Sequence, residues 1–290
     1  MTQLLRKVIF RNAFGYIFIS QLTADSSTLL LLMLWAGPAT FFRYSHEITF
    51  SFFGARIGQI SMLFWFASVY GKLLIAINRL VAITWPLEYS KVFSNRKLPL
   101  IIGALWFLAL LHALFYSTED CAFVFDALEF IWTYKETICG AIASRYLDFM
   151  HGSGTFVCIL IINTVTFFFI RRRAKEFLTK RVASLSKETY KKNVRLYIQG
   201  CLASGTLVFL NVSYNCVTLI TTTRFGVFAA TTLVWEIAHI VDGMILVIFN
   251  PQLRGGAHHP TPSINTTMVK RGSITMAKRA SVPFVNGRMQ

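Results

Sequence analysis

Six long apolar segments alternate with polar stretches along the chain. Each has about the length that a helix needs to cross a bilayer, roughly 20 residues. Backbone without hydrogen bonds is too costly in hydrocarbon, and the segments are too long for barrel strands, so each is predicted to be a transmembrane helix. The predicted spans are Phe14–Phe42, Ile57–Ile77, Leu98–Tyr116, Phe149–Ile170, Leu196–Thr222 and Phe225–Phe249.

Composition supports a membrane protein. Hydrophobic residues make up 54% of the chain and charged residues only 14%, whereas soluble domains carry about 25% charge. Such a chain cannot cover a globular surface with polar groups, so lipid must face much of it. The predicted fold class is an all-α, polytopic membrane helical bundle.

Basic residues concentrate in alternate polar stretches. With the amino terminus on the cytoplasmic side, the inner stretches hold 23 lysines and arginines and the outer ones hold five. This asymmetry follows the positive-inside rule and places the carboxyl terminus in the cytoplasm. The same asymmetry accounts for the net charge of +16. The predicted partner is therefore the lipid bilayer, and nucleic acid is not expected as a partner.

The connection Glu119–Asp148 is the one long outer loop, and it is acidic. It holds Cys121 and Cys139, and an oxidising compartment would let them pair. Two free thiols are the alternative. The five cysteines include no CxxC pair, so neither a metal site nor another cofactor is indicated.

Polar residues recur at helical spacing on four of the predicted spans. Each set falls on one face of its helix, which predicts a bundle with a polar interior and an apolar outside. The sets are Gln21, Asp25 and Thr28; Ser61, Ser68, Lys72 and Arg79; Ser204, Asn211, Asn215 and Thr222; and Glu236, His239, Gly243 and Asn250.

Lys72 lies about 10 Å deeper in the bilayer than Arg79, two helical turns away. A lysine at that depth needs a partner, and Asp25 and Asp242 are the carboxylates at comparable depth. Two interpretations stay open: an ion pair that only fixes packing, or a switch whose partner changes on activation.

Several short motifs occur in a characteristic order. Asn78-Arg79 is followed by Pro86-Leu87-Glu88-Tyr89-Ser90-Lys91. Before it comes Ser20-Gln21-Leu22-Thr23-Ala24-Asp25, and after it come Trp106, Asp242-Gly243 and Asn250-Pro251. In this order and spacing they resemble the nematode serpentine receptor class X (Srx) chemoreceptors, which are seven-helix G-protein-coupled receptors.

The resemblance implies a rhodopsin-like 7TM architecture with the amino terminus outside. We therefore expect this chain to start at the family's first inner loop, without the first helix. The expected parts are a cytoplasmic start (1–13), a transmembrane receptor domain (14–254) and a disordered basic cytoplasmic tail (255–290).

The resemblance also implies roles for single residues. Coupling to a heterotrimeric G protein is expected around Asn78, Arg79, Pro86, Tyr89, Asn250 and Pro251, with a positive-inside anchor and a plain helix stop as the alternatives. Asp25, Ser68 and Asn250 match a sodium-linked polar pocket in rhodopsin-like receptors; structural hydrogen bonding is the alternative there.

A small-molecule ligand is expected in the outer half of the bundle. The candidate contacts are Asn211, Tyr214, Asn215, Glu236 and His239, and interior packing explains them as well. In the tail, Ser273 and Ser281 each follow two basic residues, the pattern that basophilic kinases recognise; a solvated basic tail is the alternative.

Two rival interpretations remain. The segment Pro86–Lys91 fits the signature of six-helix mitochondrial carriers once, but that signature must recur three times. A truncated, non-signalling receptor remnant is the other rival. An enzyme is not expected, since the six histidines form no metal or nucleophile constellation on shared faces.

Overall fold

Helices dominate the computed structural model, which describes residues 13–179, 183–217 and 220–249. Six helical stretches in these residues are long and apolar enough to cross a bilayer: Ala13–Phe41, Phe52–Thr84, Leu98–Ser117, Ile138–Arg173, Tyr197–Val217 and Arg224–Phe249. The prediction of a polytopic helical bundle is thereby confirmed, although the helices differ in length from the predicted spans.

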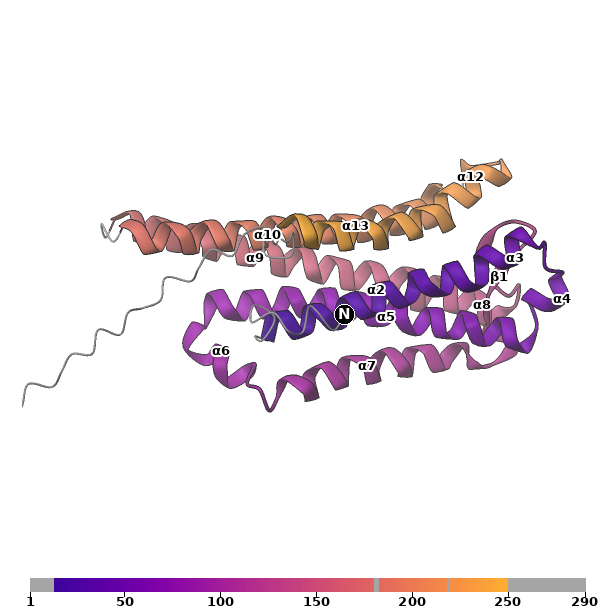
Figure 1. The fold of residues 1–290 in the computed structure, drawn as a ribbon, viewed down its shortest axis with the longest axis horizontal. Helices are drawn as coiled ribbons and strands as arrows, with labels where there is room; N and C mark the ends of the chain where they lie inside the picture. Colours follow the sequence, from indigo (N-terminus) through magenta and orange to yellow (C-terminus); the bar gives the residue numbers. More distant parts are fainter. Residues whose placement is uncertain (1–12, 180–182, 218–219, 250–290) are drawn as a thin grey trace, which may run out of the picture. The chain divides into compact units, whose positions relative to one another are not determined.

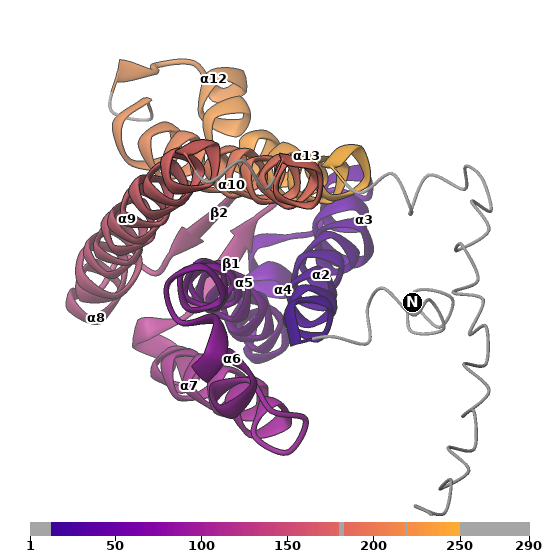
Figure 2. The ribbon, with the colours of Figure 1, turned by 90° about the vertical axis from the view of Figure 1, so that its left-hand side faces the viewer.

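Helix α5 (Phe52–Thr84) is the central helix of the bundle. It packs against α2 (Ala13–Leu31), α7 (Leu98–Leu114) and α9 (His151–Thr179), which surround it when the bundle is seen end-on (Figure 2). Helices α10 (Ala183–Val212) and α13 (Val234–Phe249) pack on each other, and α10 also contacts α9. Residues of α5 can therefore reach several other helices.

Local sequence sets both ends of α5. The Ser51 side chain accepts a hydrogen bond from the Gly54 backbone amide at its start, as a good N-cap does. The helix ends before Trp85, and Pro86 opens the short helix α6 (Pro86–Val92), a position where proline loses no hydrogen bond.

In the part of the chain that the structure describes, four helices contain a wider, π-type turn. Helix α2 continues through η2 (Leu32–Ala36) into α3 (Gly37–Phe41). The others are η5 (Ala143–Met150), η6 (Ser213–Val217) and η7 (Ala229–Leu233). Such turns often lie at functional sites. The remaining short helices are α4 (His46–Thr49), η3 (Phe115–Ser117), η4 (Glu119–Cys121), α8 (Ile138–Ile142) and α12 (Arg224–Phe228).

A β-hairpin interrupts the long loop and was not predicted. Strands β1 (Phe123–Asp126) and β2 (Ile131–Tyr134) pair antiparallel, with Phe123 opposite Tyr134. The Asp126 carboxylate accepts hydrogen bonds from two backbone amides of the turn. A disulfide joins Cys121 to Cys139 across the base of the hairpin. We call this end of the bundle the hairpin end, and the opposite end, where α6 lies, the α6 end (Figure 1).

The distribution of side chains is that of a protein in lipid. Large apolar residues such as Leu100, Phe107 and Ile161 are exposed on α7 and α9. Polar residues of α2, α5 and α13 are buried instead. This arrangement is costly in water and favourable in a bilayer, so it supports the membrane assignment independently of hydropathy.

Candidate functional site: a polar network between two cavities

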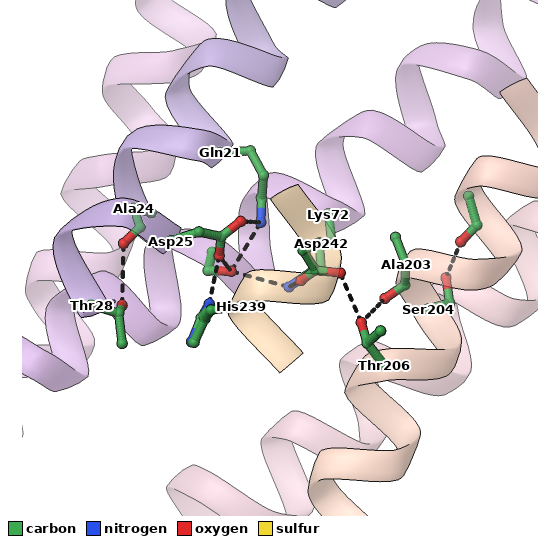
Figure 3. A network of polar contacts seen from close by, with 12 residues as sticks. Gln21, Ala24, Asp25, Thr28, Lys72, Ala203, Ser204, Thr206, His239 and Asp242 are labelled. Carbon is green, nitrogen blue, oxygen red and sulfur yellow. Dashed lines mark hydrogen bonds and ion pairs between the residues drawn. The ribbon is translucent and has the colours of Figure 1, made fainter. Parts of the chain in front are cut away.

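Five ionisable or polar side chains meet in the middle of the bundle. Asp25 of α2, Lys72 of α5, and His239 and Asp242 of α13 are labelled in Figure 3. Ser68 of α5 is the fifth. None of them is more than 9% exposed. The helical phase places Ser68 and Lys72 one turn apart on the same face of α5, and both face inward. Members of the polar stripes predicted on α2, α5 and α13 therefore meet in the interior.

Asp25 is the acceptor at one end of this network. Its Oδ1 accepts from the Ser68 hydroxyl at 2.6 Å and lies 2.8 Å from His239 Nδ1. Its Oδ2 accepts from Gln21 Nε2 at 3.1 Å. Three hydrogen-bond partners surround this carboxylate and compensate for its removal from water.

Lys72 and Asp242 form the other end. The ammonium lies 2.7 Å from Asp242 Oδ2, and both side chains are 7% exposed. Lys72 also donates to the Ser68 hydroxyl at 3.2 Å, which links the two ends. Thr206 of α10 donates to Asp242 Oδ1 at 2.8 Å (Figure 3). Lys72 thus has Asp242 as its ion-pair partner, and Asp25 is bonded to His239.

The network contains side chains that could coordinate a metal ion, but it also contains the Lys72 ammonium group. Ligand atoms of Asp25, His239 and Asp242 all lie within 4.8 Å of one another. A sodium ion among them would face the Lys72 ammonium, and like charges in a low dielectric repel strongly. These residues therefore do not fit the sodium-linked pocket that the motif resemblance implies, because a side chain already supplies the positive charge.

A polar path runs from the network toward the α6 end. One cavity is lined by Asp25, Lys72, Arg79 and Asn163, and a second by Arg79, Asn163 and Tyr89. Arg79 therefore separates the two. Its side chain is buried, lies 5.5 Å from the Phe14 ring centroid, and forms none of the ion pairs present in the described residues.

Asn78 and Tyr89 connect α5 to α6. The Asn78 amide donates to the Tyr89 hydroxyl at 3.2 Å, and Pro86 begins the helix that carries Tyr89. The residue before Arg79 is thus an amide that contacts α6, with no charge to hold the arginine.

A third cavity lies toward the hairpin end. Its walls come from α5, the hairpin, η5, α9, α10, η6 and α13, and they include Trp65, Asp148, Asn211, Tyr214 and Trp235. Trp65 donates to Asp148 Oδ1 at 3.2 Å, and Asn211 donates to Ser153 at 2.8 Å. Burial, with the neighbouring Asp148 carboxylate, raises the pKa of the Tyr134 hydroxyl in this wall well above its ordinary value, so the phenol stays protonated.

The bundle, its buried polar network and its two cavity-lined ends agree with what sequence comparison finds. The family described as serpentine type 7TM GPCR chemoreceptor Srx matches residues 1–250. The chain belongs to the Srx family. Serpentine receptor class X 45 of Caenorhabditis elegans is 24% identical over 289 residues, covering 93% of this chain and 80% of that relative. This Srx chain is accordingly a multi-pass membrane protein of a chemoreceptor family. The family assignment replaces the interpretation as a mitochondrial carrier.

The Srx chain distributes the five candidate ligand contacts over three places. Asn211, Tyr214 and Asn215 line the hairpin-end cavity. His239 is bonded to Asp25 in the network. Glu236 lies in a groove with Leu29 and Thr232, between α2–α3 and α13. The sequence pattern placed Glu236 and His239 one turn apart on the same face of the helix. In the structure Glu236 faces the groove, whereas His239 faces the interior.

Some predicted residues lie outside the described part of the Srx chain. These are Asn250, Pro251, Ser273 and Ser281.

Sequence reasoning missed two features of this Srx protein. His112 of α7 and His151 of α9 both hydrogen-bond the Tyr70 hydroxyl of α5, and their ring centroids are 4.6 Å apart. The three residues come from three different helices that only the fold brings together, so no pattern along the sequence reveals the cluster. Asp148 was placed in the outer loop, because the sequence does not show that η5 carries it into the cavity wall.

Proposed function

We propose that this protein is a chemosensory receptor that binds a small ligand in the hairpin-end cavity and activates a heterotrimeric G protein at the α6 end. The observation that carries the proposal is that α5 contributes residues to the cavity, to the polar network and to the α6 end. Trp65 lines the cavity, Ser68 and Lys72 lie in the network, and Asn78 and Arg79 lie at the α6 end. One rigid helix thus touches both ends of the receptor.

Aromatic contacts join the cavity to the network. The ring of Trp65 lies 6.1 Å from that of Trp235 and 6.3 Å from the His239 imidazole. His239 is in turn bonded to Asp25. A ligand that shifts Trp65 or Trp235 therefore acts on packed neighbours of the network, and such contiguous contacts are a physical route for coupling.

Rearrangement of the network would move α10 and α13. Asp242 of α13 holds Thr206 of α10, and Asn163 of α9 donates to Ser204 of α10 at 3.2 Å. If α10 moves away from α5, the buried Arg79 becomes accessible to a partner at the α6 end. A guanidinium is suited to backbone carbonyls and carboxylates of a docking segment, because its donors form a fixed fork.

The proposed orientation puts the hairpin end outside the plasma membrane, sensory cilia included, and the α6 end and carboxyl terminus in the cytoplasm. The disulfide at the hairpin end fits an oxidising compartment. The basic residues between Arg171 and Arg195 fit the cytoplasm. Epitope tags inserted near Glu129 and near Lys180 should report opposite compartments in intact and permeabilised cells; the same compartment for both would refute this topology.

The proposal also includes a cytoplasmic tail over residues 255–290 that kinases modify at Ser273 and Ser281. Phosphate would add roughly two negative charges at each site beside anionic lipid. Mass spectrometry of the stimulated receptor tests for phosphorylation at these two serines. A tail without phosphate would refute this part of the proposal.

G-protein activation in cells tests the proposal as a whole. Cells expressing the receptor and a G-protein dissociation sensor would be exposed to a panel of volatile and water-soluble odorants. Arg79→Ala should abolish the response while surface expression persists. Arg96→Ala is the matched control, because Arg96 is an exposed arginine at the same end. A correctly inserted receptor that activates no G protein would instead be the non-signalling remnant.

A further inference from the structure

Asp148 is a carboxylate in the wall of the hairpin-end cavity. Trp65 Nε1 donates to its Oδ1 at 3.2 Å. None of the four ion pairs in the described residues involves Asp148. By contrast, in the central network Lys72 forms an ion pair with Asp242, and His239 hydrogen-bonds Asp25. Asp148 is partly buried, and a carboxylate that is partly withdrawn from water without a neighbouring cation gains from binding one.

The rest of the cavity wall is rich in aromatic rings. Six of its fourteen residues are aromatic: Trp65, Phe123, Tyr134, Phe156, Tyr214 and Trp235. Trp65 and Trp235 are nearly perpendicular, at 88°, with centroids 6.1 Å apart. Aromatic faces attract cations through the ring quadrupole, tryptophan most strongly, and the attraction grows when water is excluded.

The two amides of the wall are neutral and already bonded within the protein. The Asn211 amide nitrogen already donates to Ser153, and the Asn215 amide nitrogen already donates to Asn211. Among the residues that the structure describes, no lysine or arginine lines the cavity. An anionic ligand would therefore meet Asp148 and find no positive charge in the lining.

The surroundings of the cavity are acidic as well. Apart from Asp148 itself, the stretch that begins at Glu119 and ends before it holds five acidic and two basic residues. A cleft near charge of one sign raises the local concentration of ligands of the opposite sign. Approach and binding thus favour the same class of ligand.

We infer that the ligand of the hairpin-end cavity is a small organic cation, an amine or quaternary ammonium compound, whose charge is held by Asp148 and by the aromatic wall. The inference rests on the proposed function, since it names the ligand class of that same site. Trp65 has two roles, because its indole N–H fixes the Asp148 carboxylate while its ring forms part of the wall.

Direct binding to the purified full-length receptor in lipid nanodiscs tests the ligand class. Choline, tetramethylammonium and phenethylamine are the cationic probes, and 3,3-dimethyl-1-butanol is the neutral isostere of choline. Tryptophan fluorescence and thermal shift report binding, because two tryptophans line the cavity. Choline should bind at least about 10-fold more tightly than its isostere, the difference expected of a charge-assisted contact. Equal binding of the two, or no binding of any cationic probe, would overturn the inference.

Asp148→Asn keeps the acceptor for Trp65 and removes the charge, so it should abolish the preference for choline. Asp120→Asn is the matched control, since Asp120 is exposed at the same end of the bundle and does not line the cavity. A preference unchanged in Asp148→Asn would also refute the inference. If Asp148→Asn fails to fold, Trp235→Leu, which removes aromatic surface from the wall, should weaken choline binding several-fold and leave the isostere unaffected.

The two levels of the argument can fail separately. Asp148-dependent binding of choline without G-protein activation in cells would refute the proposed signalling function and keep the ligand class. G-protein activation that requires Arg79 but is produced by neutral odorants alone would refute the ligand class and keep the signalling function.

Discussion

Arg79 of α5 packs directly against the backbone of Gly200 on α10: a Cβ built on Gly200 would overlap the Arg79 guanidinium nitrogen Nη1. Gly200 is itself buried. The two helices approach closely at this point only because residue 200 has no side chain. The buried state of Arg79 therefore depends on a glycine in another helix and, within the described residues, on no acidic partner.

Gly200→Ala should raise ligand-independent signalling. The added methyl group must displace either the flexible end of Arg79 or α10 itself, and both changes expose the guanidinium. We expect basal G-protein activation to rise several-fold, measured by the dissociation sensor at matched surface expression. Gly205→Ala is the control, because it gives the same gain in helix propensity on the same helix and meets nothing within 4 Å. Equal basal activity in both variants would contradict the role assigned to Gly200.

Lys72→Met should destabilise the receptor by about 3–5 kcal/mol, the range observed when one partner of a buried ion pair is removed. The reason is that the Asp242 carboxylate, 7% exposed, would lose the ammonium that now lies 2.7 Å away. Thermal unfolding in nanodiscs measures the loss. A melting temperature equal to that of the wild type would show that the pair contributes nothing to stability.

Lys72→Met combined with Asp242→Asn provides the second arm of that test. Removing both charges leaves a neutral amide that still accepts from Thr206, so most of the lost stability should return. Signalling separates the two interpretations of Lys72. A stable double variant with altered basal or stimulated activity indicates a switch, and unchanged signalling indicates a purely structural ion pair.

The sequence predicted the membrane helices well because hydropathy and length determine them directly. It underestimated α5, which runs from Phe52 to Thr84 and was predicted over Ile57–Ile77. Hydropathy falls at Asn78 and Arg79, so the predicted span ends before them. In the structure both side chains are buried among the helices of the bundle, and the helix continues. That polar residues of α2, α5 and α13 face the interior was also predictable, whereas the choice of Asp242 over Asp25 as the partner of Lys72 depends on helix rotation.

The hairpin was missed although the sequence carries a signal for it. Phe123 and Phe125 alternate with smaller or polar residues, and Trp132 and Tyr134 alternate in the same way, as aromatic strands do. Strands of four residues are too short to stand out against a loop. The cluster of Tyr70, His112 and His151 left no comparable signal, because it is formed by three helices that only the fold brings together.

Gly58→Ala should destabilise the hairpin and weaken ligand binding. A Cβ on Gly58 would overlap the backbone carbonyl of Phe123 in β1, and backbone yields less easily than a side chain. Overpacking of this kind costs about 1–3 kcal/mol, and Phe123 lines the cavity. Choline affinity and thermal unfolding are the measurements. Gly103→Ala on α7 is the control, since nothing lies within 4 Å of its added Cβ; similar effects of both changes would indicate a general effect of removing a helical glycine.

Breaking the disulfide with Cys121→Ser and Cys139→Ser should impair ligand binding more than G-protein coupling. The bond closes a loop with a sequence separation of 18 residues, for which chain entropy gives about 3 kcal/mol. That loop contains the hairpin, which contributes Phe123 and Tyr134 to the cavity wall, whereas Arg79 lies at the other end of α5. We therefore expect weaker choline binding and a lower melting temperature, with the same loss when the wild type is treated with a membrane-impermeant reductant. Cys216→Ser, which removes an exposed free thiol, should change neither quantity. Reductant sensitivity that persists in the double serine variant would place the labile bond elsewhere.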